Sequence, residues 1–234
     1  MVMDLLGELE ERQKRILQRI AELERSLLPH QFSGLAISSH PVSDNVCDGE
    51  STESRLSVIL KAGGLREFLF RRVPSDYYDK PLEYRRDCLG ASSIDHLCKS
   101  IVMVNTQAHA SVTDCSDRNN SKYYVVVIQY TARLNAENVK NFLYSLNNGN
   151  IPKKRFNMRL APEEESAKLT GYEHNGVTCI GMNTDIPVIL DEAITKLDPD
   201  FFWLGGGEVD LKLGIHTSEF INFTKPFVVN CSSN

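Results

Sequence analysis

A run of β-prone residues constrains the fold of this chain most: Tyr123-Tyr-Val-Val-Val-Ile-Gln-Tyr130. Aromatic and β-branched side chains favour strands, so the run predicts a central strand. A second apolar run, Ile101 to Val104, predicts a buried strand that is entered through Lys99. Asn135 is a good N-cap for a helix over residues 136–146, whose apolar side chains share one face. The chain therefore contains both strands and helices.

The remaining elements follow no strict βαβ rhythm. Further strands are predicted over residues 67–73, 156–160, 186–190, 201–204 and 209–213. Short helices are predicted over 55–63, 84–89, 92–98 and 192–196, after Ala161, and after a cap at Thr217. This mixture favours an α+β domain, with a mixed β-sheet and flanking helices, over a doubly wound fold.

The clearest periodicity lies at the start of the chain, where two sets of side chains each recur every seven residues: Leu6, Gln13, Ile20 and Leu27, and Leu9, Ile16 and Leu23. The alternating steps of three and four residues predict a coiled-coil helix over residues 1–29, ended by Pro29. Its partner would be a second copy of the chain, an aminoacyl-tRNA synthetase or a synthetase scaffold. A helix folded back on its own domain is the alternative. Residues 30–53 are polar and predict a flexible linker, which leaves 54–234 as the folded domain.

Composition limits the possible partners and compartment. The net charge of −5 gives no global positive field, so nucleic acid would have to be bound by a local basic patch. The six cysteines show no metal-finger spacing, which favours free thiols in a reducing compartment. The chain starts without a signal-peptide pattern and has no apolar run of membrane-spanning length. We expect a cytoplasmic protein with no membrane contact, no metal and no cofactor.

The segment from Leu169 to Gly181 is rich in glycine, with Gly171, Gly176 and Gly181, and Asn175 lies beside one of them. Such a backbone can adopt positive φ angles and present its own N–H and C=O groups to a ligand. A glycine-rich hairpin connection between two strands is the alternative, and the spacing leaves both interpretations open.

Seven pieces occur along the chain in a defined order: Lys99-Ser-Ile-Val, the strand at 123–128, Arg159-Leu-Ala-Pro-Glu-Glu, Thr170-Gly-Tyr172, the loop at 175–181, Val188-Ile-Leu-Asp-Glu192 and Gly205-Gly-Gly. In this order they resemble the YbaK/prolyl-tRNA-synthetase-associated domain family, over about residues 54–228. That family contains trans-acting aminoacyl-tRNA deacylases. The resemblance implies a mixed-sheet editing domain that hydrolyses the ester joining a wrong amino acid to the terminal adenosine of tRNA, with a small amino acid as the family's usual substrate.

The resemblance also implies a site. Its key lysine, near the terminal phosphate and ribose, corresponds to Lys99, and its loop backbone positions the ester carbonyl and the attacking water. The implied catalytic residues are Lys99, Asn175, Gly176 and Thr178. The implied substrate-binding residues are Gly171, Tyr172, Val177, Cys179, Gly205 and Gly206.

The loop departs from the family's Gly-x-x-x-Pro element at both fixed positions. Asn175 replaces the glycine, a mild change because asparagine tolerates left-handed angles. Cys179 replaces the proline, which frees φ and returns an N–H group. An alternative function therefore stays open: a catalytically silent tRNA- or synthetase-binding subunit. Cys179 could also act as a nucleophile with His174 as its base, but the favoured interpretation is that both are ordinary loop residues.

Local basic residues are the predicted tRNA contacts, because phosphate contacts carry most sequence-independent affinity. The first group comprises Lys153, Lys154, Arg155 and Arg159, and the second comprises Arg71 and Arg72. A solvated surface cluster without a ligand is the alternative.

Overall fold

The computed structural model describes Arg19 and residues 51–233. The coiled-coil helix predicted over 1–29, apart from Arg19, and most of the linker predicted over 30–53 lie outside the described residues. Both stay predictions. Residues 52 and 53, assigned to the linker from the sequence, belong instead to the first helix of the described part, which Ser51 caps by accepting a hydrogen bond from the Ser54 N–H.

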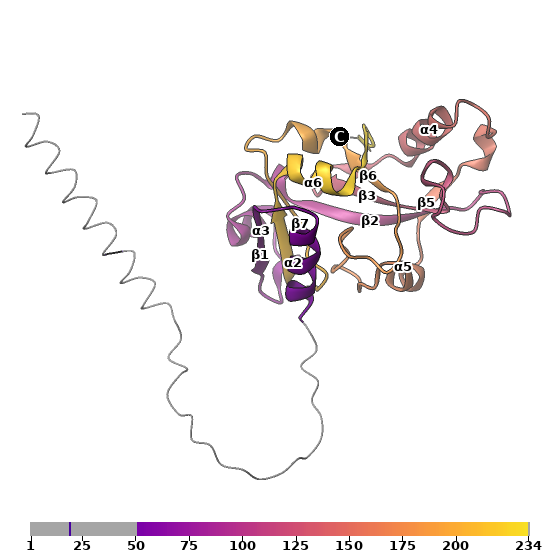
Figure 1. Ribbon diagram of the computed structural model, residues 1–234. Helices are drawn as coiled ribbons and strands as arrows, with labels where there is room; N and C mark the ends of the chain where they lie inside the picture. Colours follow the sequence, from indigo (N-terminus) through magenta and orange to yellow (C-terminus); the bar gives the residue numbers. More distant parts are fainter. Residues whose placement is uncertain (1–18, 20–50, 234) are drawn as a thin grey trace, which may run out of the picture. The chain divides into compact units, whose positions relative to one another are not determined.

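The described residues form an α+β fold. Its α-helices are α2 (Thr52–Ala62), α3 (Leu82–Leu89), α4 (Ala136–Leu146), α5 (Glu163–Thr170) and α6 (Thr217–Thr224) (Figure 1). Its strands are β1 (Phe68–Arg72), β2 (Cys98–Asn105), β3 (Tyr123–Gln129), β4 (Arg133–Leu134), β5 (Met158–Leu160), β6 (Val188–Asp191), β7 (Phe202–Gly205), β8 (Leu211–Ile215), β9 (Phe227–Val229) and β10 (Ser232–Ser233).

The main sheet has five strands in the order β5-β2-β3-β6-β9. β2 pairs antiparallel with β3 and β5, whereas β6 pairs parallel with β3 and β9. The predicted mixed sheet is thus confirmed, with β3 at its centre. A second, antiparallel sheet has the order β1-β8-β7, and the short strands β10 and β4 form a separate ladder.

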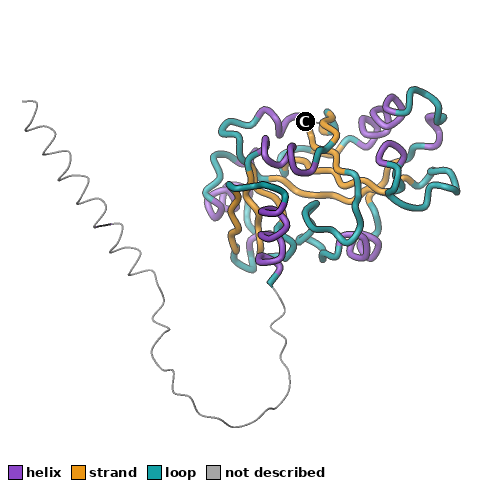
Figure 2. Tube along the Cα trace, viewed as in Figure 1, coloured by secondary structure: helices purple, strands orange, loops and turns teal. Residues whose placement is uncertain are grey.

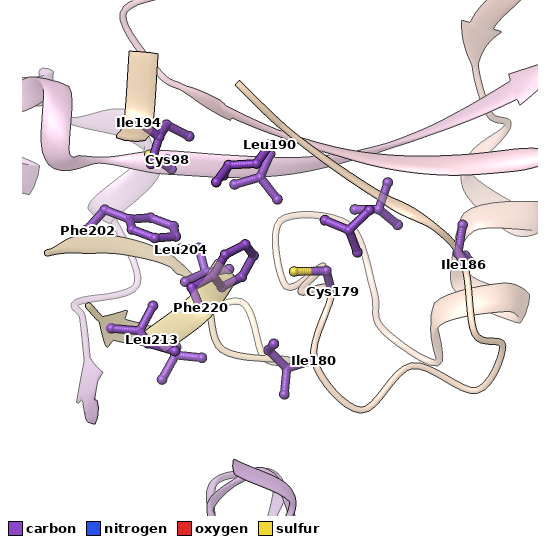
Figure 3. Packing of buried hydrophobic residues seen from close by; sticks show 14 of the residues in the cluster. Cys98, Cys179, Ile180, Ile186, Leu190, Ile194, Phe202, Leu204, Leu213 and Phe220 are labelled. Carbon is purple, nitrogen blue, oxygen red and sulfur yellow. The ribbon is translucent and has the colours of Figure 1, made fainter. Parts of the chain in front are cut away.

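Alternate residues of β3 face two different cores, because successive side chains of a strand point to opposite faces. Val125 and Val127 pack in the larger cluster, which includes side chains from α2, β7, β8 and α6. Figure 3 shows Phe202, Leu213 and Phe220 of this cluster. Tyr124 and Val126 pack on the other face, against Val139 and Leu143 of α4 and other side chains. Coverage of both faces explains why the sequence of β3 is apolar without alternation.

The structure corrects several predicted boundaries. The strand predicted over 156–160 begins only at Met158, because residues Lys153–Arg155 form a 3-10 turn that the Phe156 N–H closes. The helix predicted over 92–98 shrinks to a 3-10 turn, Ile94–His96, because Cys98 and Lys99 already pair with β3. The helix predicted over 192–196 is also a 3-10 helix. Thr217 is the first residue of α6 and does not cap it.

The connection from α5 to β6 carries the glycine-rich segment and contains no helix or strand (Figure 2). It packs against the end of β7, so residues far apart in the sequence meet there. Within the described part of the chain, no helix has the length and apolar character that crossing a bilayer requires.

Candidate active site

A cleft of about 310 Å³ lies where β2, the start of α5, the glycine-rich loop and the end of β7 meet. Its lining residues are Tyr78, Lys99, Ser100, Ile101, Val102, Tyr130, Leu160, Ala161, Glu163, Ser166, Tyr172, His174, Asn175, Val177 and Gly205. Five residues predicted from the sequence are among them: Lys99, Tyr172, Asn175, Val177 and Gly205. Much of the wall is apolar, which suits a small side chain or a ribose face.

Lys99 supplies positive charge to the cleft. Its side chain is half-buried, and its Nζ lies 5.3 Å from the centre of the Tyr130 ring. Partial burial lowers the pKa of this ammonium group below its ordinary value, because desolvation disfavours the charged form. No carboxylate among the described residues forms an ion pair with Lys99. An unpaired, partly desolvated cation is suited to binding an anion.

The loop at 173–178 is held mainly through its backbone. Asn175 has a φ angle of 65°, the left-handed conformation that its side chain tolerates. The Gly176 carbonyl accepts a hydrogen bond of 3.0 Å from the Gly207 N–H. A Cβ atom on Gly205 would collide with the Val177 carbonyl, so only glycine permits this close approach. The N–H groups of Asn175 and Val177 donate to no other described residue.

A second contact to the loop comes from Tyr78, whose hydroxyl donates to the Asn175 carbonyl at 2.7 Å. The same hydroxyl accepts a hydrogen bond of 2.8 Å from Nζ of Lys212, a buried lysine of β8. Burial lowers the pKa of Lys212 to about 8 and raises that of Tyr78.

Tyr172 ties the start of the loop to α2. Its hydroxyl donates to the Ile180 carbonyl at 2.6 Å and accepts from Arg55 at 3.0 Å. Arg55 also donates to the Gly181 carbonyl at 3.0 Å. Because the hydroxyl group of Tyr172 is occupied in this way, the residue lines the cleft with its ring and anchors the loop.

Five predicted site residues do not line the cleft. Thr178 is fully buried and accepts from the Ile180 N–H through its hydroxyl. Gly176 has its backbone packed against Glu208 and Val209. Gly171 ends α5 with a φ angle of 79°, and Gly206 packs on Leu211. These four residues therefore pack behind the cleft, whereas His174, Asn175 and Val177 of the loop line it.

Cys179, the fifth, points into the larger core cluster (Figure 3). It also lines a separate cavity of about 640 Å³ and does not share the cleft with His174, which is exposed. Burial raises the pKa of the Cys179 thiol to about 12. The nucleophile that a cysteine provides is the thiolate, so the geometry and the pKa both contradict a Cys179–His174 pair.

The predicted basic residues are on the surface. Lys153, Lys154, Arg155 and Arg159 are all exposed, and Lys153 lies 3.5 Å from a Glu137 carboxylate oxygen. Arg72 is held by Glu208 and Asp210 at 2.8 and 2.9 Å, which neutralises most of its charge. Arg71 donates to the Cys88 carbonyl at 3.2 Å and lies over the Trp203 ring.

Sequence reasoning missed several residues of the site, chiefly Tyr78, Tyr130, Leu160, Glu163 and Ser166, together with Lys212 behind it. Glu163 belongs to the piece Arg159-Leu-Ala-Pro-Glu-Glu, which carries the family resemblance, and it is the first residue of α5. This position could have indicated that Glu163 belongs to the site. Tyr78 and Lys212 gave no signal because 134 positions separate them in the sequence.

Solved structures share this fold. A candidate trans-editing enzyme for prolyl tRNA synthetase aligns with a TM-score of 0.60 at 19% identity, covering 78% of this chain and 98% of that one. A structure from the computational grafting of epitope backbones onto scaffold proteins gives a TM-score of 0.60 at 16% identity, covering 78% and 97%. A hypothetical protein aligns with a TM-score of 0.57 at 22% identity, covering 76% of this chain and 99% of that one. At these identities the likeness shows the fold alone.

The family follows from the sequence. Residues 91–223, more than half of the chain, match the family of aminoacyl-tRNA editing domains. This protein therefore belongs to the aminoacyl-tRNA editing domain family, and the resemblance to YbaK-like domains is confirmed. A search of curated proteins gives no significant match.

Proposed function

We propose that this protein is a trans-editing deacylase, which hydrolyses the ester between a mischarged small amino acid and the terminal adenosine of tRNA. The observation that carries the proposal is Lys99, a half-buried cation in the cleft without a carboxylate partner among the described residues. A lysine of this kind acts as a point charge for the terminal phosphate of the acceptor end. Membership of the editing-domain family supports the reaction class.

The reaction needs no protein nucleophile. A water molecule adds to the ester carbonyl, and the negative charge that develops on the carbonyl oxygen is stabilised by backbone N–H groups. Asn175 and Val177 offer N–H groups that donate to no other described residue. When the C–O bond breaks, the ribose oxygen leaves and takes the proton of the attacking water, with a ribose hydroxyl of the tRNA as the carrier.

Side chains around the cleft fit an amino acid ester. The α-amino group of such an ester is cationic, and Glu163 is a cleft-lining carboxylate that would attract it. Ile101, Val102 and Val177 supply an apolar wall for a small side chain. Alanine, serine, threonine and cysteine are the candidate amino acids.

Single-turnover deacylation of tRNAs mischarged with these four amino acids tests the proposal. We expect Lys99→Ala to lower the rate by about 100-fold, because loss of the phosphate contact misplaces the ester relative to the loop N–H groups. Lys122→Ala is the matched control, because Lys122 is also half-buried next to β3 but does not line the cleft. If the wild-type protein hydrolyses none of the four, the alternative of a silent tRNA- or synthetase-binding subunit replaces this proposal.

A further inference from the structure

Lys212 is an unusual residue to find inside a domain. Only 4% of its surface is exposed, and lysines are almost never fully buried unless they are paired. Its Nζ forms no ion pair with a described residue. Its hydrogen-bond acceptors are the Val209 carbonyl at 2.7 Å and the Tyr78 hydroxyl at 2.8 Å. The ammonium group also lies 5.3 Å and 4.7 Å from the ring centres of Tyr77 and Tyr78.

The bond from Lys212 fixes how the Tyr78 hydroxyl is used. Because an ammonium group can only donate, the hydroxyl oxygen accepts from it and the hydroxyl proton is directed to the Asn175 carbonyl, 2.7 Å away. Hydrogen bonds in such a chain polarise one another, and a charged donor strengthens the first of them. A buried positive charge is thereby connected, through one side chain, to the loop at the edge of the cleft.

Stability alone does not explain a buried lysine at position 212. Replacing a buried charge by an apolar side chain of similar volume is often neutral or stabilising, so burial of Lys212 weighs against stability. The peptide to which it connects is also the one that needs support, since Asn175 has a positive φ angle. A non-glycine residue in this conformation is retained only where the surroundings hold it.

We propose that Lys212 is a positioning residue that acts through Tyr78 to hold the Asn175 peptide, and with it the loop N–H groups, at the cleft. The link to catalysis rests on the proposed deacylase function, whereas the effect on the loop does not. Neither residue needs to contact the reacting atoms for this role. The Lys212–Tyr78 pair differs from Lys99, because Lys99 supplies charge to the cleft directly.

Three single variants of the full chain, and the double variant Tyr78→Phe with Lys212→Met, test the proposal. Tyr78→Phe removes the hydroxyl and keeps the ring, and Lys212→Met removes the charge and keeps the length. Tyr77→Phe is the matched control, because Tyr77 also places its ring against Lys212 but does not line the cleft or bond to the loop. Hydrogen–deuterium exchange of the loop amides and single-turnover deacylation are measured for each variant.

We expect Tyr78→Phe and Lys212→Met to speed exchange of the Gly176 and Gly207 amides, whose hydrogen bonds hold the loop, by about fivefold, the effect of losing one hydrogen bond of about 1 kcal/mol. Each should slow deacylation at saturating protein by about 5- to 10-fold while tRNA affinity is unchanged, as expected when only the transition state is affected. The double variant should be no slower than the slower single variant, because the two residues act in series. Tyr77→Phe should match the wild type.

Equal loop exchange in Tyr78→Phe and Tyr77→Phe would overturn the proposal, and so would a loosened loop in an enzyme that keeps its full rate. If the wild-type protein hydrolyses no mischarged tRNA, the proposed function fails. The exchange measurement alone then decides whether the Lys212–Tyr78 pair holds the loop. Tyr78→Phe keeps the test decisive if Lys212→Met does not fold.

Discussion

At the scale of single residues, the position of Cys179 argues against a cysteine nucleophile in the cleft. Its thiol lies in the core, and burial raises its pKa to about 12, so almost no thiolate is present near neutral pH. We expect Cys179→Ala to keep the deacylation rate within about twofold and to lower the free energy of unfolding by about 1–2 kcal/mol, because a buried side chain is shortened. Single-turnover rates and urea unfolding check both parts. A folded variant without activity would restore the nucleophile hypothesis.

Lys212 gives a second prediction at this scale, in the dependence of stability on pH. Burial lowers its pKa from 10.5 to about 8 in the folded protein. The unfolded chain therefore holds the proton more tightly, and the cost of the buried charge is fully present below about pH 8 and is relieved as the pH rises towards 10.5. Other charged or titratable groups around it are Asp210, Arg85, Tyr77, Tyr78, Tyr130 and Cys98.

Because those neighbours also titrate, the prediction concerns the difference between two proteins. Between about pH 7 and about pH 9.5, the wild type should gain about 2 kcal/mol of stability relative to Lys212→Met. Urea unfolding of both proteins at the two pH values measures it. If the stability of both proteins changed by the same amount between the two pH values, Lys212 would have an ordinary pKa in the folded state.

At the scale of elements, the short 3-10 turn Lys153–Arg155 presents the basic group proposed to contact tRNA. Lys154 and Arg155 are exposed, whereas Lys153 already pairs with Glu137. We expect the double change Lys154→Glu and Arg155→Glu to weaken tRNA binding and to reduce the slope of log affinity against log salt by about 1 to 2, since each lost phosphate contact removes about 0.7 to 0.9.

Lys61→Glu is the control for this experiment, because it changes an exposed lysine at the end of α2. Filter binding at several salt concentrations provides the slopes. If the double variant and the control have the same slope, the basic turn is an ordinary solvated surface.

Elements also show how far the sequence could predict this fold. The helix at 136–146 was predicted to the residue, because Asn135 caps it with bonds of 3.1 and 3.2 Å and its apolar face is regular. The strand β3 was predicted within one residue because its side chains favour strands on either face. The second sheet was not predicted, since the pairing of β1 with β8 joins segments far apart in the sequence. The same distance hid the contact between Tyr78 and Lys212, whereas Lys99 and the loop lay within recognisable motifs.

At the scale of the whole molecule, the seven-residue repeat over residues 6–27 lies, apart from Arg19, outside the described residues. We propose that it forms a coiled coil that keeps the editing domain near charged tRNA. A tether of this kind can raise the effective concentration to about millimolar, which would benefit an acidic protein with only local basic patches.

Light scattering on the full chain and on a chain starting at Asp48 measures the contribution of the arm. The shorter chain keeps Ser51, whose side chain caps α2. We expect the full chain to self-associate, or its arm to retain a synthetase or scaffold from a cytosolic extract, and the shorter chain to be monomeric. Two monomers, with nothing retained by the arm, would favour a helix that packs on its own domain.

The glycine contacts between the loop and the end of β7 hold one side of the loop through backbone atoms alone. Gly176 and Gly205 hold the loop through backbone atoms, while His174 and Val177 line the cleft. If the protein is the deacylase proposed above, we expect substitutions of these two side chains to alter which amino acid is accepted while the backbone N–H groups of the loop stay in place. In the proposed deacylase, substrate preference and catalytic geometry would then be separable traits, and single substitutions would suffice to change the preferred amino acid.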